Sequence, residues 1–230
     1  MLAQVVLFDG FDPLDVIAPY EVLLASGLVT AQGIDAELVS AEGPREVPSG
    51  LKSVSLRATA ALEPGRADIV VLPGALGRLP DGDEPTDDSI PAILGRTLQT
   101  PLPALLKEAL GKPGLTVASV CGGSMILALA GLIENRPATT HHMGMDLLGA
   151  TGARSVDARV IDDGNLVTGA TVTSGLDVGL HLLERELGPR VAHAVEQLIA
   201  YERRGTVWRE TGAELLPHAA AVSRNTGEDQ

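Results

Sequence analysis

Three short apolar runs, each followed at once by a turn, constrain the fold more than any other feature of this sequence. They are residues 3–8 (AQVVLF), 67–72 (ADIVVL) and 115–120 (LTVASV), and segments with helical periodicity separate them. Continuous runs of this length, rich in valine, isoleucine and leucine, are typical of strands buried on both faces of a parallel sheet. The alternation of such strands with helices predicts an α/β fold with a mostly parallel central sheet.

The composition limits both the core and the partners. Aromatic residues make up 2% of the 230 residues and apolar residues 45%, so aliphatic side chains must build the core. The formal net charge of −13 argues against nucleic acids and anionic membranes as partners. No apolar run reaches the ~20 residues of a membrane span, and the amino terminus lacks a signal-peptide pattern. A single cysteine cannot form an internal disulfide, so we expect a cytoplasmic protein. His141 and His142 would point in opposite directions in a strand and no second cluster follows them, so we expect no metal site, and we expect no cofactor.

Glycine and proline divide the rest of the chain. We expect one α/β domain over residues 1–204 and a polar C-terminal extension over 205–230, partly mobile in its last ten residues. Pro19 interrupts the first helical pattern and predicts two short pieces. The other expected elements are a strand at 35–41, loop and short strand over 42–64, an exposed acidic loop at 77–91, broken helix over 90–110, a helix at 122–132, a short strand at 138–141, helical turns at 143–148, a hairpin of 159–162 with 165–168, and helices at 173–187 and 189–201.

The loops that follow the three strong strands should meet at one edge of the sheet. In open parallel sheets the chemistry collects at the carboxyl ends of the strands. These loops are residues 9–13, 73–75 and 121–123. The last of them holds the only cysteine of the chain, followed by two glycines.

Cys121 stands where a strand gives way to a helix, which is the position of a nucleophile in a nucleophile elbow. Gly122 and Gly123 leave room for the tight turn, and the N–H of Gly122 can face a developing oxyanion. The positive end of the following helix favours a thiolate. The alternative is a cysteine that packs as a small hydrophobe. The two glycines and the abrupt change from strand to helix favour the nucleophile.

Four stretches together resemble the DJ-1/PfpI superfamily, which has the class I glutamine amidotransferase-like fold. They are VLFDGFDPLDVIAPYEVL (5–24), DIVVLPGA (68–75), SVCGGSMILALAGLIENRPATTH (119–141) and VIDDGNLVTGATVTSGLDVGLHLLE (160–184). Within the superfamily the chain looks most similar to the isonitrile hydratases and to the sensor domains of related AraC-type regulators. The resemblance implies a flavodoxin-like three-layer sandwich, a small-molecule substrate and a homodimer.

The resemblance also implies site residues. Asp15 matches an aspartate that acts as acid or base in isonitrile hydratases, and a carboxyl beside a thiolate should have a raised pKa. Glu21 is a second candidate, because DJ-1-like proteins carry the acidic partner of the cysteine in that neighbourhood. Without the resemblance, Asp15 is an ordinary carboxylate at a helix amino terminus. We expect Cys121 and Asp15 to be catalytic.

Further residues are candidates for the oxyanion hole and the pocket. The amides of Gly74 and Ala75 can complete an oxyanion hole with Gly122, although a Pro-Gly turn commonly ends a strand without any such role. A histidine at His141 lies near the cysteine in several relatives. The remaining candidates for the pocket are Ile17 and Thr173, the latter equally explained as a helix N-cap.

Departures from the pattern leave alternatives open. PfpI-type peptidases carry a histidine directly after the nucleophile, and glutamine amidotransferases carry a downstream His-x-Glu pair; this chain has neither. Isonitrile hydratases carry a threonine where this chain has Gly122. The sequence therefore predicts a cysteine-dependent hydratase or hydrolase, with hydration of an isonitrile to an N-substituted formamide as the leading reaction. A redox- or ligand-sensing protein and a DJ-1-type glyoxalase or deglycase are the alternatives.

Overall fold

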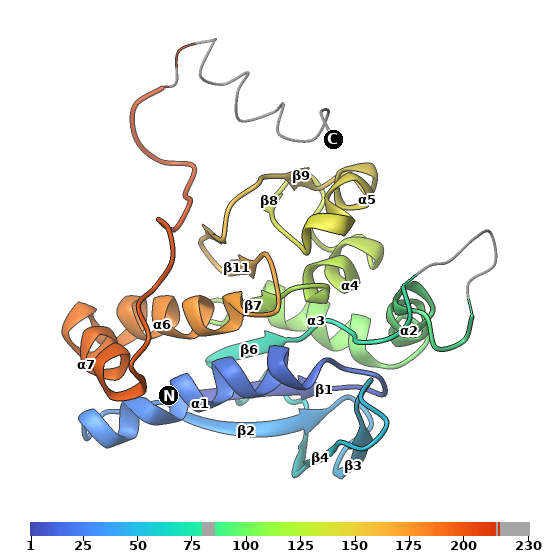
Figure 1. The fold of residues 1–230 in the computed structure, drawn as a ribbon, viewed down its shortest axis with the longest axis horizontal. Coiled ribbons are helices and arrows are strands. Elements are labelled where there is room, and N and C mark those ends of the chain that lie inside the picture. Colours follow the sequence, from blue (N-terminus) through green and yellow to red (C-terminus); the bar gives the residue numbers. More distant parts are fainter. Residues whose placement is uncertain (80–85, 215, 217–230) are drawn as a thin grey trace.

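The computed structural model describes residues 1–79, 86–214 and 216. Among these residues, a seven-stranded sheet forms the centre of the fold (Figure 1). The strands are β1 (Leu2–Leu7), β2 (Asp35–Ser40), β5 (Ala60–Ala61), β6 (Ile69–Leu72), β7 (Thr116–Val120), β10 (Val160–Asp163) and β11 (Leu166–Gly169). Their order across the sheet is β10-β11-β7-β6-β1-β2-β5. All neighbours are parallel except β10 and β11, which form the expected antiparallel hairpin. The mostly parallel sheet is therefore confirmed.

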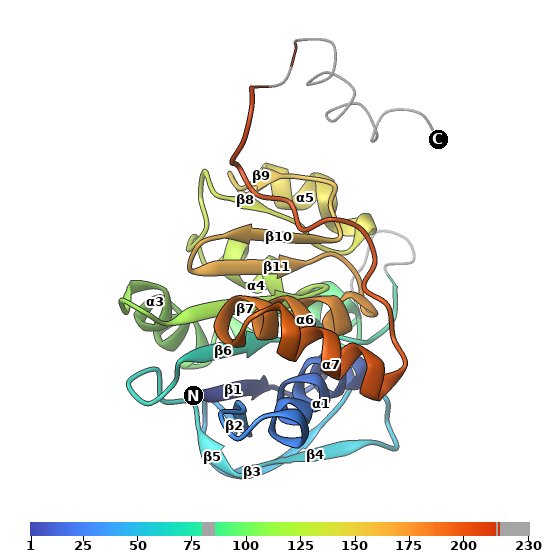
Figure 2. The ribbon, with the colours of Figure 1, turned by 90° about the vertical axis from the view of Figure 1, so that its left-hand side faces the viewer.

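Helices cover both faces of this sheet, which confirms the three-layer α/β sandwich. The main helices are α1 (Pro13–Val29), α2 (Ile90–Thr97), α3 (Leu102–Gly111), α4 (Gly123–Leu129), α6 (Ser174–Leu187) and α7 (Pro189–Ile199). Helices α1, α6 and α7 pack against one another in front of the strands in Figure 2, whereas α2 and α3 both pack on α4. Smaller elements are the pair β3 (Arg45–Pro48) and β4 (Ser55–Ala58), the pair β8 (Pro137–Ala138) and β9 (Arg154–Ser155), the 3-10 helix η1 (His142–Gly144) and α5 (Met145–Ala150).

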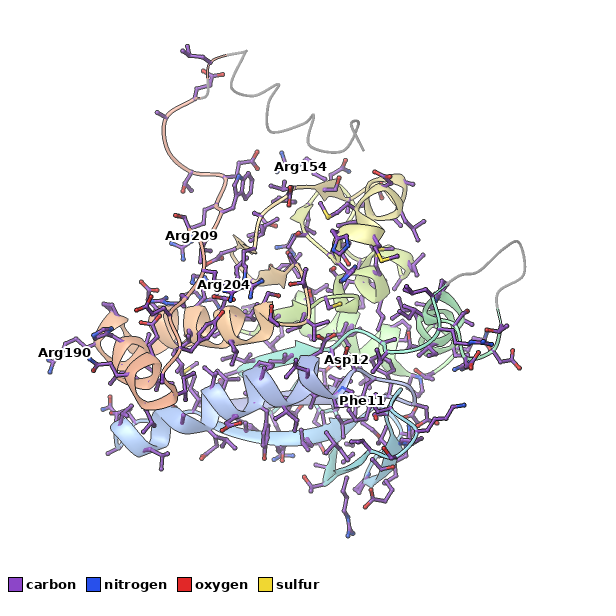
Figure 3. All side chains as sticks on the ribbon, in the orientation of Figure 1. Phe11, Asp12, Arg154, Arg190, Arg204 and Arg209 are labelled. Carbon is purple, nitrogen blue, oxygen red and sulfur yellow. The ribbon has the colours of Figure 1, made fainter. Side chains whose placement is uncertain are left out.

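The core is aliphatic, as the composition requires. The four residues of β6 and the five residues of β7 are all buried. They alternate between the two helical layers, so neither face of these central strands meets solvent. Phe11 is the largest side chain that is fully buried, and it lies just before α1 (Figure 3).

Helix α1 is continuous, so the prediction that Pro19 would split it is wrong. Tertiary packing outweighs the missing N–H of the proline. Helix α6 packs closely against α1 at Pro19, through two of its glycines. A side chain at Gly175 would come within 3.0 Å of Pro19 Cδ, and one at Gly179 within 2.8 Å of Val22 Cγ1. The buried seam between α1 and α6 thus holds the proline inside a single helix.

Other boundaries also differ from those expected. Helix α4 ends at Leu129 and not at 132, because the chain turns into a left-handed conformation at Gly131 (φ +69°). The expected strand at 138–141 is a strand only as far as Ala138, and the following residues run as extended chain toward η1. Residues 42–64 hold a hairpin and β5 where we expected loop and one short strand.

The first part of the C-terminal extension packs along the edge strand β10 (Figure 2). The N–H of Trp208 donates to Val160 O and the N–H of Asp162 donates to Trp208 O, both at 2.9 Å. Arg209 then reaches back to the Asp162 carboxylate (2.7 Å). The prediction that the last ten residues are mobile, and part of the predicted loop at 77–91, lie outside the described residues.

Candidate active site

Cys121 lies between the end of β7 and the start of α4, where the chain turns sharply. Its φ is +53°, a left-handed conformation that costs a non-glycine residue about 1–2 kcal/mol. Its N–H donates to Gly169 O at the end of β11 (3.0 Å), and its carbonyl oxygen accepts from the Thr140 hydroxyl (3.0 Å). A strained cysteine that its surroundings fix in this way has the geometry of a nucleophile elbow.

The glycines around the elbow have different reasons to be glycine. A side chain at Gly123 would lie 2.2 Å from Leu72 O, and one at Gly74 would lie 2.5 Å from Gly122 N, so both positions require glycine. A side chain at Gly122 would meet nothing closer than Gly74 Cα at 3.5 Å. With φ −68° its backbone suits any residue. The fold therefore does not require glycine directly after the cysteine.

Asp15 approaches Cys121 from the first turn of α1 and is fully buried. Its Oδ2 accepts a hydrogen bond from Gly74 N–H (2.9 Å), while its Oδ1 is buried without a well-formed partner. Burial raises the pKa of Asp15 to about 8, and the charge of Asp12 adds to the effect. The Gly74 N–H and the Cys121 thiol oppose this rise in pKa, which shows that thiol and carboxyl interact. The carboxyl is protonated near neutral pH.

The sulfur of Cys121 is in a similar environment. The residue is 7% exposed, and burial raises the pKa of its thiol well above the ordinary range, with the charge of Asp15 as the second cause. The backbone N–H of Gly122 faces the sulfur and opposes the rise in pKa. The helix that should favour a thiolate has only seven residues. The resting site is therefore a neutral thiol beside a neutral acid, and not the thiolate that we expected.

Two of the three predicted oxyanion donors lie side by side. The position that a side chain at Gly122 would take is 3.8 Å from Ala75 N, so the Ala75 amide lies beside Gly122. The N–H of Gly74 already donates to Asp15 and is not free for a substrate oxygen. The predicted oxyanion hole is thus left with Ala75 and Gly122, while Gly74 holds the acid.

The segment after β8 passes directly beside the elbow. Thr140, 1% exposed, hydrogen-bonds the Cys121 carbonyl. The next residue, His141, is partly buried; its Nδ1 accepts from Met143 N–H (3.4 Å), and its ring lies against that of His142 at 4.1 Å between centroids. Burial and the neighbouring His142 lower the pKa of His141. A neutral imidazole already engaged by its own turn is a weak candidate for a base acting on the thiol.

The remaining predicted residues do not gather at the sulfur. Glu21 is exposed on α1, so the carboxyl that acts on Cys121 is that of Asp15. Ile17 is partly buried against the core. Thr173 occupies the N-cap position of α6 without a capping hydrogen bond, and its hydroxyl accepts from Arg159 Nη2 (3.1 Å).

Sequence reasoning missed three contributors. Asp12, the N-cap of α1, adds its charge to the raised pKa values of Asp15 and Cys121. Thr140 and Ser124 surround the Cys121 carbonyl with hydroxyl groups. The place of Asp12 in the first loop could suggest that it lies near the site, but the contact of Thr140 with Cys121 joins residues 19 apart and leaves no local signal.

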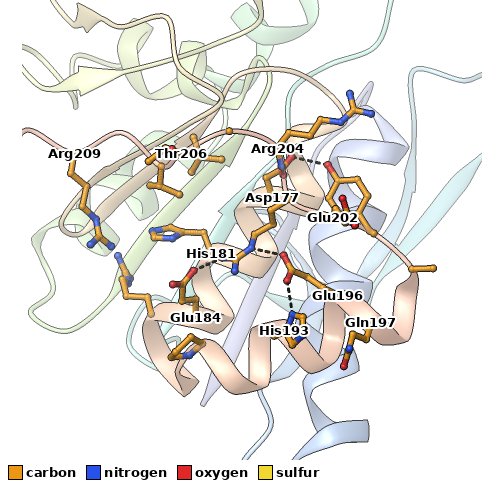
Figure 4. Close-up of a pocket in the computed structure, with 18 residues that line it drawn as sticks. Asp177, His181, Glu184, His193, Glu196, Gln197, Glu202, Arg204, Thr206 and Arg209 are labelled. Atoms are coloured by element: carbon orange, nitrogen blue, oxygen red, sulfur yellow. Dashed lines mark hydrogen bonds and ion pairs between the residues drawn. The ribbon is translucent and has the colours of Figure 1, made fainter.

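Two large surface hollows lie away from the sulfur. A groove of about 1230 Å³ runs between α6, α7 and residues 201–209, with His181, Asp177 and Arg209 in its wall (Figure 4). A second hollow of about 1000 Å³ includes Leu76 and Ile93. Neither includes Cys121.

Among the described residues, no three His, Cys, Asp or Glu side chains are placed to hold a metal ion. None of the described helices combines the length and the apolar character needed to cross a membrane.

Comparisons with known proteins identify the family of this chain. The DJ-1/PfpI family matches residues 94–185. Isonitrile hydratase from Pseudomonas putida is 32% identical over 197 residues, which cover 85% of this chain and 76% of that protein. A deglycase from Pyrococcus abyssi is 28% identical over 70% of this chain and 84% of its own length.

Among solved structures, DJ-1beta from Drosophila melanogaster superposes with a TM-score of 0.70 at 20% identity and covers 87% of this chain and 98% of its own. A THiJ/PfpI family protein from Pseudomonas syringae has the same TM-score at 24% identity, over 89% of this chain and 76% of its own. These two likenesses concern the fold, whereas the identity and coverage of the hydratase extend to sequence. The chain belongs to the DJ-1/PfpI family.

Proposed function

We propose that the protein is an isonitrile hydratase, which converts a small apolar isonitrile to an N-substituted formamide through a covalent bond to Cys121. The observation that carries this proposal is the Asp15 carboxyl, whose pKa is raised to about 8 beside a neutral thiol. An isonitrile has a terminal carbon that must receive both a proton and a nucleophile. A carboxylic acid kept protonated near neutral pH supplies the first, and the thiol supplies the second.

The reaction follows in two stages. Asp15 gives its proton to the terminal carbon while the sulfur bonds to that carbon, and the thiol proton passes to the carboxylate, which leaves a thioimidate. Water then adds to the thioimidate carbon, and one of its protons moves to nitrogen. The carbon–sulfur bond breaks, the hydroxyl proton returns to sulfur, and the formamide leaves. The amides of Ala75 and Gly122 stabilise the substrate oxygen during this second stage.

The alternatives have weaker support. A DJ-1-type glyoxalase or deglycase would use Glu21 beside the cysteine, and Glu21 is exposed. A peroxide sensor needs a reactive thiolate, and the pKa of Cys121 is raised. Peroxide titration followed by intact mass tests the sensor: a thiol that is not oxidised by stoichiometric peroxide excludes it.

The test of the proposal is turnover of cyclohexyl and phenyl isonitriles, with the formamide measured by chromatography. We expect C121A to be inactive and D15N to lose at least 10²-fold in kcat, the usual contribution of a general acid. For the wild type, kcat/KM should fall as pH rises through about 8, because Asp15 loses the proton that the first stage needs. Turnover no greater than that of C121A would refute the proposal.

Two further properties belong with this proposal. We propose a homodimer and a cytoplasmic location, as the family resemblance and the single cysteine suggest. Sedimentation analysis at micromolar concentration decides the first: a monomer would contradict it.

A further inference from the structure

The carbonyl group of Cys121 has an unusual environment. Cys121 has the strained backbone conformation of the elbow, with a positive φ. Among the described residues, no backbone N–H donates to its carbonyl oxygen. Two buried hydroxyls lie within reach instead: Thr140 Oγ1 at 3.0 Å and Ser124 Oγ at 3.3 Å. A buried carbonyl needs a donor, so one of these hydroxyls must supply it.

The number of protons decides which hydroxyl this is. Ser124 Oγ also lies 2.7 Å from Thr139 O, and a hydroxyl has one proton to donate. The shorter and more normal contact takes that proton, since 2.7 Å is the usual length of such a bond and 3.3 Å exceeds the usual range. Thr140 is therefore the donor to the Cys121 carbonyl.

This carbonyl belongs to the same planar peptide group as the N–H of Gly122. That N–H points to the sulfur and lowers the pKa of the thiol. Because the two groups point in opposite directions, the hydrogen bond that holds the Cys121 carbonyl oxygen toward Thr140 also holds the Gly122 N–H toward the sulfur. If the peptide rotated, the carbonyl oxygen would face the sulfur and the oxyanion hole would lose one of its two donors.

We propose that Thr140 is a positioning residue that locks the Cys121–Gly122 peptide with its N–H toward the sulfur. This rests on the proposed function only for the turnover measurements, because the lock also controls how readily the thiol reacts with any reagent. The neighbouring Thr139 is equally buried (1% exposed), but among the described residues its hydroxyl donates only to Met145 Sδ (3.8 Å). Thr139 is thus a matched control of the same residue type.

The experiment compares T140V, T140S and T139V. Each is alkylated with iodoacetamide between pH 6 and 10 and followed by intact mass, which is unambiguous because Cys121 is the only cysteine. We expect T140V to react at least 10-fold more slowly than wild type at pH 8, and more slowly at every pH of this range, because the pKa of the thiol, already raised above its ordinary value, rises further. T140S should return to within about 3-fold of wild type, and T139V should match wild type. In isonitrile turnover, T140V should lower kcat ~10²-fold with KM nearly unchanged, the scale of one oxyanion donor.

The outcomes separate this inference from the proposed function. If the wild type turns over no isonitrile, the proposed function fails, and the alkylation profiles still decide the role of Thr140. A T140V profile equal to wild type, or an equal loss in T139V, overturns the inference. If T140V does not fold, T140A replaces it, and thermal melts of all variants show whether a slower reaction merely follows lower stability.

Discussion

At the scale of single residues, the raised pKa of Asp15 links activity to stability. The carboxyl is fully buried, with Asp12 as its charged neighbour, and its pKa is about 8 against 3.8 for the ordinary group. Between these values the folded protein keeps a proton that the unfolded chain has lost. The free energy of unfolding therefore falls as pH rises from about 4 to 8. The protonated acid that suits the chemistry is obtained at the cost of stability at neutral pH.

The variant D15N should show this cost directly. An amide keeps the acceptor for Gly74 N–H but never ionises, so we expect the free energy of unfolding at pH 7 to rise by about 1–4 kcal/mol; the upper value is 3.2 pKa units at 1.36 kcal/mol each. The gain should vanish near pH 4. Urea unfolding at several pH values measures it. E21Q, on the exposed face of the same helix, is the control and should change stability by less than ~0.5 kcal/mol. A D15N protein less stable than wild type at pH 7 would contradict the argument.

At the scale of the elements, the sequence predicted the parts that local patterns determine. The buried strands β1, β6 and β7 were predicted because each is a continuous aliphatic run, and Cys121 was singled out because it follows such a strand. Asp15 was singled out through the family resemblance, and the catalytic role of both residues stays a prediction. The continuity of α1 could not be foreseen, since it depends on packing against α6. The same limit applies to the protonation of the site, because burial and the contact between Asp15 and Cys121 are properties of the assembled layers.

The contact between β6 and α4 gives a prediction about the two adjacent glycines. G123A should destabilise the protein by several kcal/mol, because its methyl group would lie 2.2 Å from Leu72 O and force the helix off the sheet. G122A should fold with a stability within about 1 kcal/mol of wild type, because its methyl group meets only ordinary contacts. Thermal and urea unfolding of both variants measure this. Equal losses of stability in G122A and G123A would show that the close contact with Leu72 O is not the reason for glycine at position 123.

At the scale of the whole molecule, two buried carboxylates have opposite surroundings. Asp15 meets another acid and a thiol, whereas Asp162 on β10 meets His181 Nε2 (2.8 Å) and Arg209 Nη2 (2.7 Å), with Arg185 Nη1 at 3.7 Å. Burial opposes the ionisation of Asp162, but the hydrogen bonds from His181 and Arg209 and the charge of Arg185 outweigh it and hold the pKa of this carboxyl well below its usual range. Arg185 and Arg209 thus link α6 and the C-terminal segment to the edge strand β10. Neither arginine pairs with Asp15. This division lets one fold keep one buried carboxyl neutral and another charged.

The two carboxylates should consequently respond to pH with opposite signs. A carboxylate with a lowered pKa stabilises the fold above the pKa of the unfolded group and loses this effect as pH falls. D162N should therefore cost about 3 kcal/mol at pH 7, the scale of a broken buried ion pair, and progressively less below pH 4. D163N is the matched control: Asp163 pairs with Arg136 at the half-exposed surface (2.6 Å), so its loss should stay below ~1 kcal/mol. Between pH 4 and 8, D15N should be more stable than wild type and D162N less stable than wild type. Unfolding curves of the three variants from pH 3 to 8 therefore test the whole arrangement. Parallel pH dependences for D15N and D162N would mean that the cations do not distinguish the two ends of the sheet.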